Sequence, residues 1–373
     1  MKIASVYIHI PFCLRKCNYC DFVSYPLADC STVRGHYPQL VLQELELYRE
    51  ELDFSPLRTI YFGGGTPSIL EAAEISQLLA AFPAATEITL EANPETLDEA
   101  KLAAFYQAGI NRLSLGVQSF KPQLLTSMGR GHTSEQSQAM VTAARRAGFA
   151  NINIDLIYGL PGQSLQDWQE DIADALALGT EHISLYSLTV EEGTPWWQME
   201  RDGLICPADQ DLSADMLEYA IDALAAAGYR HYEISNFARP GFESQHNLAY
   251  WRRENYLGLG VAAAGCMLNY RYYNHRTLAD YQTMLEKGQR PVFDEEHLTI
   301  DQVMSEAIFL GLRLAEGINF KSFAEQYGVN PLKRYRKQIR KMAEAGLLEV
   351  NEKGMYLSRR GVLLGNEVFM QFV

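Results

Sequence analysis

Three cysteines gathered in one short stretch are the residues with the clearest capacity for chemistry. Cys13, Cys17 and Cys20 are spaced C-x3-C-x2-C within HIPFCLRKCNYCDF, residues 9–22. In a chain whose thiols stay reduced, such a group favours metal binding or redox chemistry over disulfides. Three further cysteines lie far apart in the sequence, and we expect them to be buried and unreactive: Cys30, Cys206 and Cys266.

The spacing of these thiols leaves two kinds of metal site open. Three thiolates from one loop can hold three irons of a [4Fe–4S] cluster and leave the fourth iron free to bind another ligand. Structural zinc takes four protein ligands, usually as two Cys or His pairs. His9 or Asp21 could complete a zinc site, but no second pair follows at a suitable spacing. The pattern therefore favours the open cluster, with zinc as the alternative.

The first 230 residues show a repeating pattern that would position this loop. Short β-branched and aromatic runs alternate with longer Ala/Leu/Glu segments of helical period, several of which end in glycine. Six such units predict an α/β fold with a parallel sheet and outer helices. A closed barrel typically needs ~250 residues, so we expect an open, partial parallel β/α barrel of about six strands. The predicted strands are 5–10, 59–64, 87–92, 112–118, 152–159 and 182–190, and the clearest helices are 37–52, 98–109, 134–148 and 164–179.

The pattern changes after about residue 229. Aromatic-rich strands are predicted within 229–241 and 267–276, joined by a loop that contains HNLAYW. The last part of the chain predicts two or three helices and a hairpin that turns near Asn351–Gly354, as in a small winged-helix-like α+β domain. We therefore expect a partial barrel at 1–228, a β-rich segment at 229–296 and the winged-helix-like domain at 297–373.

Other candidate ligand contacts follow the predicted strands, at the edge where parallel α/β folds gather functional groups. The glycines of FGGGTPS (62–68) allow a ligand to come close to the backbone, although a tight strand-to-helix turn would also need them. A buried carboxylate is costly unless paired, so we interpret Glu91 and Asp155 as ligand contacts. Gln118 and Arg130 lie at the same predicted edge.

Composition and charge exclude several classes of protein. The 373 residues are 47% hydrophobic and 21% charged, which is ordinary for a globular chain. A net charge of −14 argues against a general nucleic-acid binder. The opening apolar run is too short for a signal peptide, and no stretch approaches the ~18 apolar residues of a membrane span, so we expect a cytoplasmic protein. The basic run KRYRKQIRK (333–341) predicts either a solvated helix face or a peripheral contact with an anionic membrane or acidic partner.

Six segments together resemble one radical S-adenosylmethionine family, that of oxygen-independent coproporphyrinogen III oxidase and its relatives. They are YIHIPFCLRKCNYCDF, GGGTPS, EANPE, NRLSLGVQSF, GRGH and NIDLIYGLPGQ, and the resemblance extends over essentially the whole chain. It implies a [4Fe–4S] cluster on the three clustered cysteines, with S-adenosylmethionine on the open iron. It also implies contacts to that S-adenosylmethionine from Tyr7, Tyr19, Gly64, Gly65, Thr66 and Glu91, and places Gln118, Arg130 and Asp155 where the oxidase contacts a second S-adenosylmethionine.

Two departures from the oxidase point to one branch of this family. Phe22 stands where the oxidase has a fourth cysteine, and the cluster loop starts at residue 13, whereas the oxidase carries a long extension before it. Both features match the HemW-type haem chaperones, whose H-N-x-x-Y-W motif fits HNLAYW (246–251). The resemblance implies haem as a ligand, His246 as its axial contact and a haem-acceptor protein as partner. A histidine satisfied by backbone groups is the alternative. Ala264 replaces a histidine that these chaperones usually carry.

Three functions are compatible with these observations. The first is a haem chaperone that retains a cluster and S-adenosylmethionine. The second is an anaerobic enzyme acting on a tetrapyrrole, either an oxidase or a haem-degrading enzyme, and the third is a non-catalytic iron–sulfur module. Phe22 and HNLAYW favour the first, and coproporphyrinogen III oxidase activity is not expected.

Overall fold

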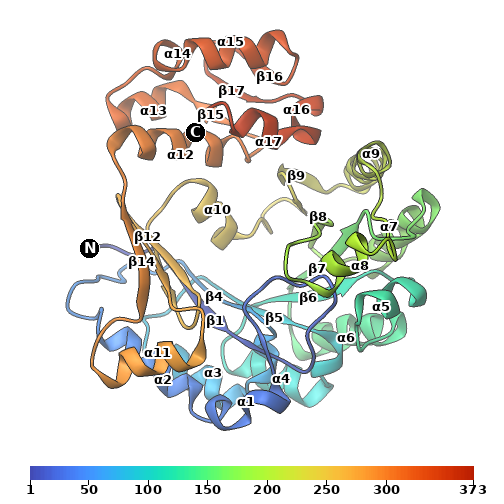
Figure 1. The fold of residues 1–373 in the computed structure, drawn as a ribbon, viewed down its shortest axis with the longest axis vertical. Coiled ribbons are helices and arrows are strands. Elements are labelled where there is room, and N and C mark those ends of the chain that lie inside the picture. The colour runs from blue at the N-terminus through green and yellow to red at the C-terminus, as the bar shows by residue number, and fades with distance from the viewer.

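The computed structural model describes residues 1–373 and is built around one twelve-stranded sheet (Figure 1). The strand order is β14-β13-β12-β11-β1-β4-β5-β6-β7-β8-β10-β9, and the two end strands do not pair with each other. The barrel is therefore open, as predicted, and the six predicted parallel strands are confirmed. A seventh, β11, pairs in parallel with β1. The parallel strands are β1 (Ser5–Ile10), β4 (Thr59–Gly64), β5 (Glu87–Ala92), β6 (Arg112–Gln118), β7 (Asn151–Tyr158), β8 (His182–Ser187) and β11 (Tyr256–Leu259).

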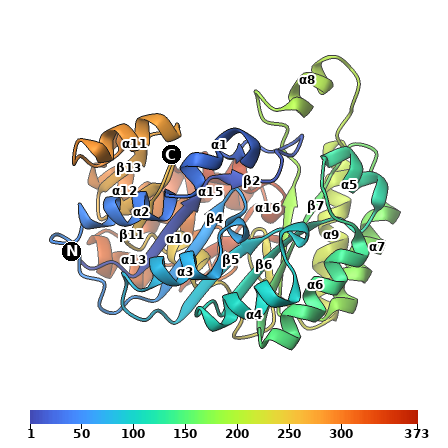
Figure 2. The same cartoon turned by 90° about the horizontal axis from the view of Figure 1, so that it is seen from below.

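Helices along the outer face keep the parallel strands out of water (Figure 2). Residues 112–117 of β6 are all buried, as expected for a strand covered on both faces. Capping boxes start α6 at Thr133 and α7 at Ser164, and left-handed glycines end both helices. The helix predicted over 37–52 ends early, at Glu46. The outer helices are α2 (Tyr37–Glu46), α3 (Ala72–Leu79), α4 (Glu99–Gln107), α6 (Ser134–Ala147), α7 (Leu165–Leu178) and α9 (Gln210–Ala226).

Residues 229–296 add strands to both ends of this sheet. β9 and β10 extend the β8 end, whereas β12, β13 and β14 extend the β11 end. The strands predicted within 229–241 and 267–276 are thus confirmed, but the loop predicted around HNLAYW is wrong. Ser244 caps a short helix there by accepting a hydrogen bond from Asn247 N–H at 3.3 Å. These elements are β9 (Arg230–Glu233), β10 (Asn236–Ala238), α10 (Gln245–Trp251), β12 (Ala264–Met267), β13 (Tyr270–Asn274), α11 (Leu278–Glu286) and β14 (Val292–His297).

The C-terminal residues form helices and a small three-stranded sheet above α10 (Figure 1). The predicted hairpin is confirmed, and Asn351 Oδ1 accepts a hydrogen bond from Gly354 N–H at 3.0 Å in its turn. Buried side chains between Met304 and Phe372 form a second hydrophobic core. The elements are α12 (Ile300–Gly311), β15 (Ile318–Asn319), α13 (Phe320–Tyr327), α14 (Pro331–Arg334), α15 (Arg336–Glu344), β16 (Leu348–Val350), β17 (Gly354–Leu357), α16 (Arg359–Leu363) and α17 (Gly365–Phe369).

Short elements flank the cysteine loop at the carboxyl edge of the sheet. Within the loop itself, two two-residue strands pair with each other. One short helix follows this loop directly, and two more follow the strands β6 and β8. None of the helices has the length and apolar character needed to span a membrane. The short elements are β2 (Phe12–Cys13), β3 (Tyr25–Pro26), α1 (Leu27–Arg34), α5 (Pro122–Met128) and α8 (Pro195–Arg201).

Candidate functional site

The three clustered cysteines face one cavity at the carboxyl ends of the parallel strands. Cys13 is buried, whereas Cys17 and Cys20 are partly exposed. Asn18 fixes the loop between them, because its N–H donates to Met128 O at 3.0 Å and its carbonyl accepts from Trp196 N–H at 3.0 Å. The end of α5 and the start of α8 thus hold the thiols in place.

The glycine loop after β4 supports the cysteine loop from behind. Gly65 N–H donates to Ile10 O at 2.9 Å, and Thr66 N–H donates to Phe12 O at 2.7 Å. A Cβ on Gly65 would lie 2.7 Å from Phe12 O, so no larger residue fits there. Gly64 has a φ of +114°, which also favours glycine. Thr66 Oγ1 donates to Cys13 Sγ at 3.4 Å and so reaches the first thiol directly.

A cavity of about 350 Å³ brings most of the predicted site residues together, and we call it the thiol cavity. Its walls combine the cysteine loop with the ends of strands β4 to β8, as the predicted topology requires. Of the predicted residues, Tyr7 and His246 do not line it. Those that do are Cys13, Cys17, Tyr19, Cys20, Gly64, Gly65, Thr66, Glu91, Gln118, Arg130 and Asp155.

Glu91 is a buried carboxyl group in the wall of the thiol cavity. Tyr61 Oη donates to its Oε1 at 2.7 Å and Gly64 N–H to its Oε2 at 3.1 Å. Burial raises the pKa of Glu91 to about 7, and the nearby Asp155 adds to the increase. A carboxyl group so poised can accept hydrogen bonds from a ligand amino group or hydroxyl.

Arg130 and Gln118 also line the thiol cavity. Arg130 Nη2 donates to Asn93 Oδ1 at 2.6 Å and to Gly116 O at 2.5 Å, while its Nη1 lies 3.6 Å from Cys17 Sγ. Its buried Nε has no protein partner. Gln118 has a φ of +68° at an irregularity in the β6–β7 ladder. Such strain in a non-glycine residue is typical of functional sites.

These features fit an iron–sulfur cluster with a bound small molecule. Burial raises the pKa of Cys20 to about 11, so a thiolate there needs a compensating cation, which bound iron supplies. No group of three or more His, Cys, Asp or Glu side chains converges to hold a single metal ion, as a zinc site requires. A cluster instead presents separate irons to separate thiolates. The orphaned Arg130 Nε leaves a donor available to a ligand.

Four further residues shape the thiol cavity that were not among the predicted site residues. Tyr61 holds Glu91, and Asn93 links Arg130 to Thr66. Gly116 has no room for a side chain, because a Cβ there would lie 2.8 Å from Asn93 Oδ1. Glu95 pairs with His132 at 3.1 Å, and the pKa of Glu95 falls to about 2 because hydrogen bonding and the nearby Arg130 outweigh its burial. Asn93 and Glu95 belong to the EANPE segment and directly follow β5. Their place at the carboxyl end of a parallel strand could have identified them as candidate site residues.

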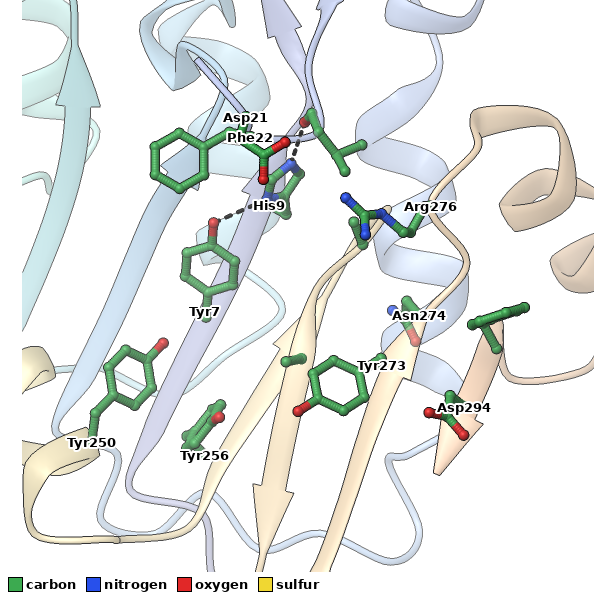
Figure 3. Close-up of a pocket in the computed structure, with 14 residues that line it drawn as sticks. Tyr7, His9, Asp21, Phe22, Tyr250, Tyr256, Tyr273, Asn274, Arg276 and Asp294 are labelled. Carbon is green, nitrogen blue, oxygen red and sulfur yellow. Dashed lines mark hydrogen bonds between the residues drawn. The ribbon is translucent and has the colours of Figure 1, made fainter. Parts of the chain in front are cut away.

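Tyr7, next to Tyr61, lines a second cavity of about 490 Å³ (Figure 3). The two rings stack at a centroid distance of 6.2 Å. Tyr7 Oη lies 3.0 Å from His9 Nδ1, and His9 Nε2 lies 2.8 Å from Val23 O. We call this second space the tyrosine cavity, because Tyr7, Tyr250, Tyr256 and Tyr273 line it. Phe22 borders both cavities.

His246 lies in α10 and is buried, with 1% of its surface exposed. Its Nδ1 lies 2.7 Å from Thr59 Oγ1 and its Nε2 lies 2.8 Å from Tyr250 Oη, so side chains rather than backbone groups satisfy the ring. Burial lowers its pKa to about 3, and the ring is therefore neutral. Tyr250 separates it from the tyrosine cavity, while Trp251 lies under Arg313 at 4.2 Å.

The isolated cysteines are not all alike. Cys30 and Cys266 are buried, as predicted, but Cys206 is exposed. The prediction of burial fails for Cys206 because it lies in the irregular segment between α8 and α9, where no strand or helix covers it.

Comparisons with known proteins agree with this arrangement. Residues 7–175 match the Radical SAM superfamily model, and residues 298–364 match the HemN C-terminal domain model. The chain is 38% identical to "Heme chaperone HemW" of Lactococcus lactis, over 100% of this chain and 98% of that one. It is also 38% identical to "Heme chaperone HemW" of Bacillus subtilis, over 99% of each chain.

A solved structure shares the whole architecture. Coproporphyrinogen III oxidase (HemN) from Escherichia coli, a radical SAM enzyme, superposes with a TM-score of 0.83 at 25% identity, over 99% of this chain and 89% of that chain. The radical SAM superfamily implies a [4Fe–4S] cluster and S-adenosylmethionine. Since the HemW proteins match from end to end at 38% identity, this chain belongs to the HemW haem chaperone family of the radical SAM superfamily.

Proposed function

We propose that this chain is a haem chaperone that carries a [4Fe–4S] cluster and S-adenosylmethionine, binds haem and transfers it to an acceptor protein. Relatives named as haem chaperones match its full length. The structural observation that carries the proposal is that Tyr250 of the HNLAYW helix lines a cavity outside the thiol cavity. Haem can therefore be held as cargo apart from the cluster.

The thiol cavity would hold the cluster and S-adenosylmethionine. Cys13, Cys17 and Cys20 offer three thiolates, which leaves one iron for the small molecule. The Glu91 carboxyl group would accept a hydrogen bond from the amino group of S-adenosylmethionine, and Arg130 would donate one to its carboxylate. When bound there, the cluster and S-adenosylmethionine would supply one-electron chemistry, in which an electron releases methionine and a 5′-deoxyadenosyl radical. The residues of the chain position the molecule and limit its contact with water.

His246 would supply the axial ligand to haem through Nε2. Thr59 holds Nδ1, so the ring orientation is set from the side away from the cavity. Tyr250 Oη occupies Nε2 in the structure, so ligation requires Tyr250 to turn away. A neutral imidazole is the form that coordinates iron, and burial keeps His246 neutral.

A second candidate is an anaerobic radical SAM enzyme acting on a tetrapyrrole, either an oxidase or a haem-degrading enzyme. The full-length likeness to coproporphyrinogen III oxidase favours it. Against the oxidase, Phe22 stands at the position of that enzyme's fourth cysteine.

Haem titration and a coproporphyrinogen III assay on anaerobically reconstituted protein separate the two candidates. We expect about one haem per chain with a shifted Soret band, and no vinyl product. His246→Ala should lose most of that shift, whereas His297→Ala, which removes an exposed histidine, should retain it. Product formation together with normal haem binding by His246→Ala would support the second candidate instead.

We also propose a cytoplasmic location and a peripheral contact with an anionic membrane or an acidic partner. Lys333, Arg336 and Lys337 are exposed on α14 and α15, whereas Arg334 and Arg340 are paired with carboxylates. Such a contact is worth ~1 kcal/mol per basic residue near an anionic surface and weakens with salt. With a net charge of −14, nucleic acid is not proposed as a partner.

A further inference from the structure

The tyrosine cavity lies between β1 and strands β11 to β14, beside the HNLAYW helix (Figure 3). Its volume of about 490 Å³ falls within the ~300–1,000 Å³ typical of small-molecule and cofactor sites. Most of its walls are apolar or aromatic, which suits a flat aromatic ligand. The aromatic residues are Tyr7, Phe22, Tyr250, Tyr256, Tyr273 and Phe293.

Three of these rings are exposed to solvent. Phe22 and Phe293 each have 68% of their surface exposed, and Tyr273 has 41%. They come from three separate segments, namely the cysteine loop, β14 and β13, yet they border one hollow. Single exposed apolar residues are ordinary, but a group of them around a cavity indicates a binding surface.

Arg276 brings a positive charge to the tyrosine cavity. Figure 3 shows its guanidinium pointing toward the side where His9 lies. Arg271, in β13, is paired with two glutamates, whereas Arg276 has no such partner. The other ionisable groups that line the space are Asp21, Asp294 and His9, whose pKa falls to about 4 through burial. An unpaired guanidinium can bind a ligand carboxylate through two hydrogen bonds.

Tyr250 is the residue that separates this cavity from His246. Its Oη lies 2.8 Å from His246 Nε2, and its ring borders both the tyrosine cavity and a smaller cavity of about 250 Å³. The smaller cavity thus lies directly beside the Tyr250 side chain. Thr59 would keep the imidazole in place during that movement, because it holds Nδ1 at 2.7 Å.

We propose that the tyrosine cavity is the haem site. The aromatic walls contact the porphyrin faces, Arg276 pairs with a propionate, and His246 Nε2 reaches the iron once Tyr250 turns into the smaller cavity. This assignment rests on the proposed haem-chaperone function and deepens it, because it states where the haem lies and which of its edges points to Arg276.

The propionate contact can be tested with haem and haem dimethyl ester, which has no carboxylates, on the full reconstituted chain. Arg276→Gln should raise the Kd for haem about tenfold or more. The ester should bind wild type and Arg276→Gln equally, and Arg360→Gln should match wild type with both probes. An unchanged Kd for haem in Arg276→Gln would overturn the assignment.

The position of the iron can be tested by moving its ligand. Ala264, on β12, lines the tyrosine cavity, so Ala264→His in a His246→Ala background presents a new imidazole to that space. We expect the Soret shift lost in His246→Ala to return, with the iron–sulfur absorbance showing that the double variant is folded. A folded double variant without the shift would show that the iron lies elsewhere. Absence of haem binding by wild type would instead contradict the proposed function.

Discussion

The thiol cavity and the tyrosine cavity lie side by side, but the chain builds them in different ways. The thiol cavity uses the ends of consecutive strands β4 to β8 and the loop after β1, so its residues follow one another in the sequence. The tyrosine cavity joins Tyr7 to Tyr250 and Tyr273 because β11 pairs with β1, with Tyr7 opposite Gly258. Local motifs can therefore reveal the first site, whereas the second depends on strand pairing across some 250 residues.

A buried glutamate stands beside each cavity, and the two have different tasks. Glu91 faces the thiol cavity. Glu44, in α2, accepts hydrogen bonds from Gly260 N–H at 2.7 Å, Asn274 Nδ2 at 2.6 Å and Tyr281 Oη at 2.6 Å. It thereby ties β13 and the loop after β11 to the barrel. Burial raises the pKa of both carboxyl groups to about 7.

The largest expected effect tests whether the cavities are independent. Replacing Cys13, Cys17 or Cys20 with alanine should reduce bound iron from about four per chain to nearly none, because a cluster does not persist on two thiolates. Haem binding should persist, since haem is proposed to occupy the other cavity. Iron analysis and haem titration measure both, with Cys30→Ala and Cys266→Ala as controls. If haem binding disappears with the cluster, the two cavities act as one site.

A stability measurement tests the support of the tyrosine cavity. Glu44→Gln should lower the free energy of unfolding by about 3 kcal/mol, because the amide N–H₂ replaces one acceptor oxygen and then faces a buried donor. The affinity for haem should fall more than the affinity for S-adenosylmethionine, because Glu44 holds β13 and the loop after β11, which lie beside the tyrosine cavity and not the thiol cavity. Urea unfolding of the apo protein measures the stability. A loss equal to that of an exposed substitution such as Glu349→Gln would refute this role for Glu44.

The pH dependence of stability tests the thiol-cavity carboxyl group. The pKa of Glu91 rises from 4.5 to about 7 on folding, so unfolding above pH 4.5 releases a bound proton. Its contribution is fully present below pH 4.5 and is lost as the pH rises through 7, about 3 kcal/mol in total. Glu91→Gln should flatten this part of the curve for the apo protein between pH 5 and 8. An identical slope in the variant would show that Glu91 titrates normally.

The smallest expected effect concerns the partner of the haem ligand. Thr59→Val removes the hydroxyl that holds His246 Nδ1 and should weaken haem binding about tenfold, as loss of a hydrogen bond behind a metal ligand does. Thr59→Ser retains the hydroxyl and should behave like wild type. Equal weakening by both variants would indicate a packing effect, and no weakening by Thr59→Val would show that Nδ1 needs no support.

Sequence reasoning worked best where one segment contains the whole signal. The cysteine loop, the glycine loop and the residues ending β5 and β6 were predicted to meet at one edge, and the structure brings them to one cavity, because parallel strands share a carboxyl edge. Sequence reasoning failed for α10, because a helix of seven residues is too short to show a helical period. The one local sign of this helix was Ser244, a residue type that often caps helix N-termini. Tyr7, which the resemblance groups with the thiols, lines the tyrosine cavity and stacks on Tyr61, which lines the thiol cavity.

The sequence by itself determined the thiol spacing, the order of the βα units and the family, since each depends on residues close together in the chain. Only the tertiary structure decided that β11 returns to pair with β1, that His246 is buried behind Tyr250, and that Phe22, Tyr273 and Phe293 surround one cavity. The physical reason is that these relations depend on long-range strand register and packing, which leave no local pattern.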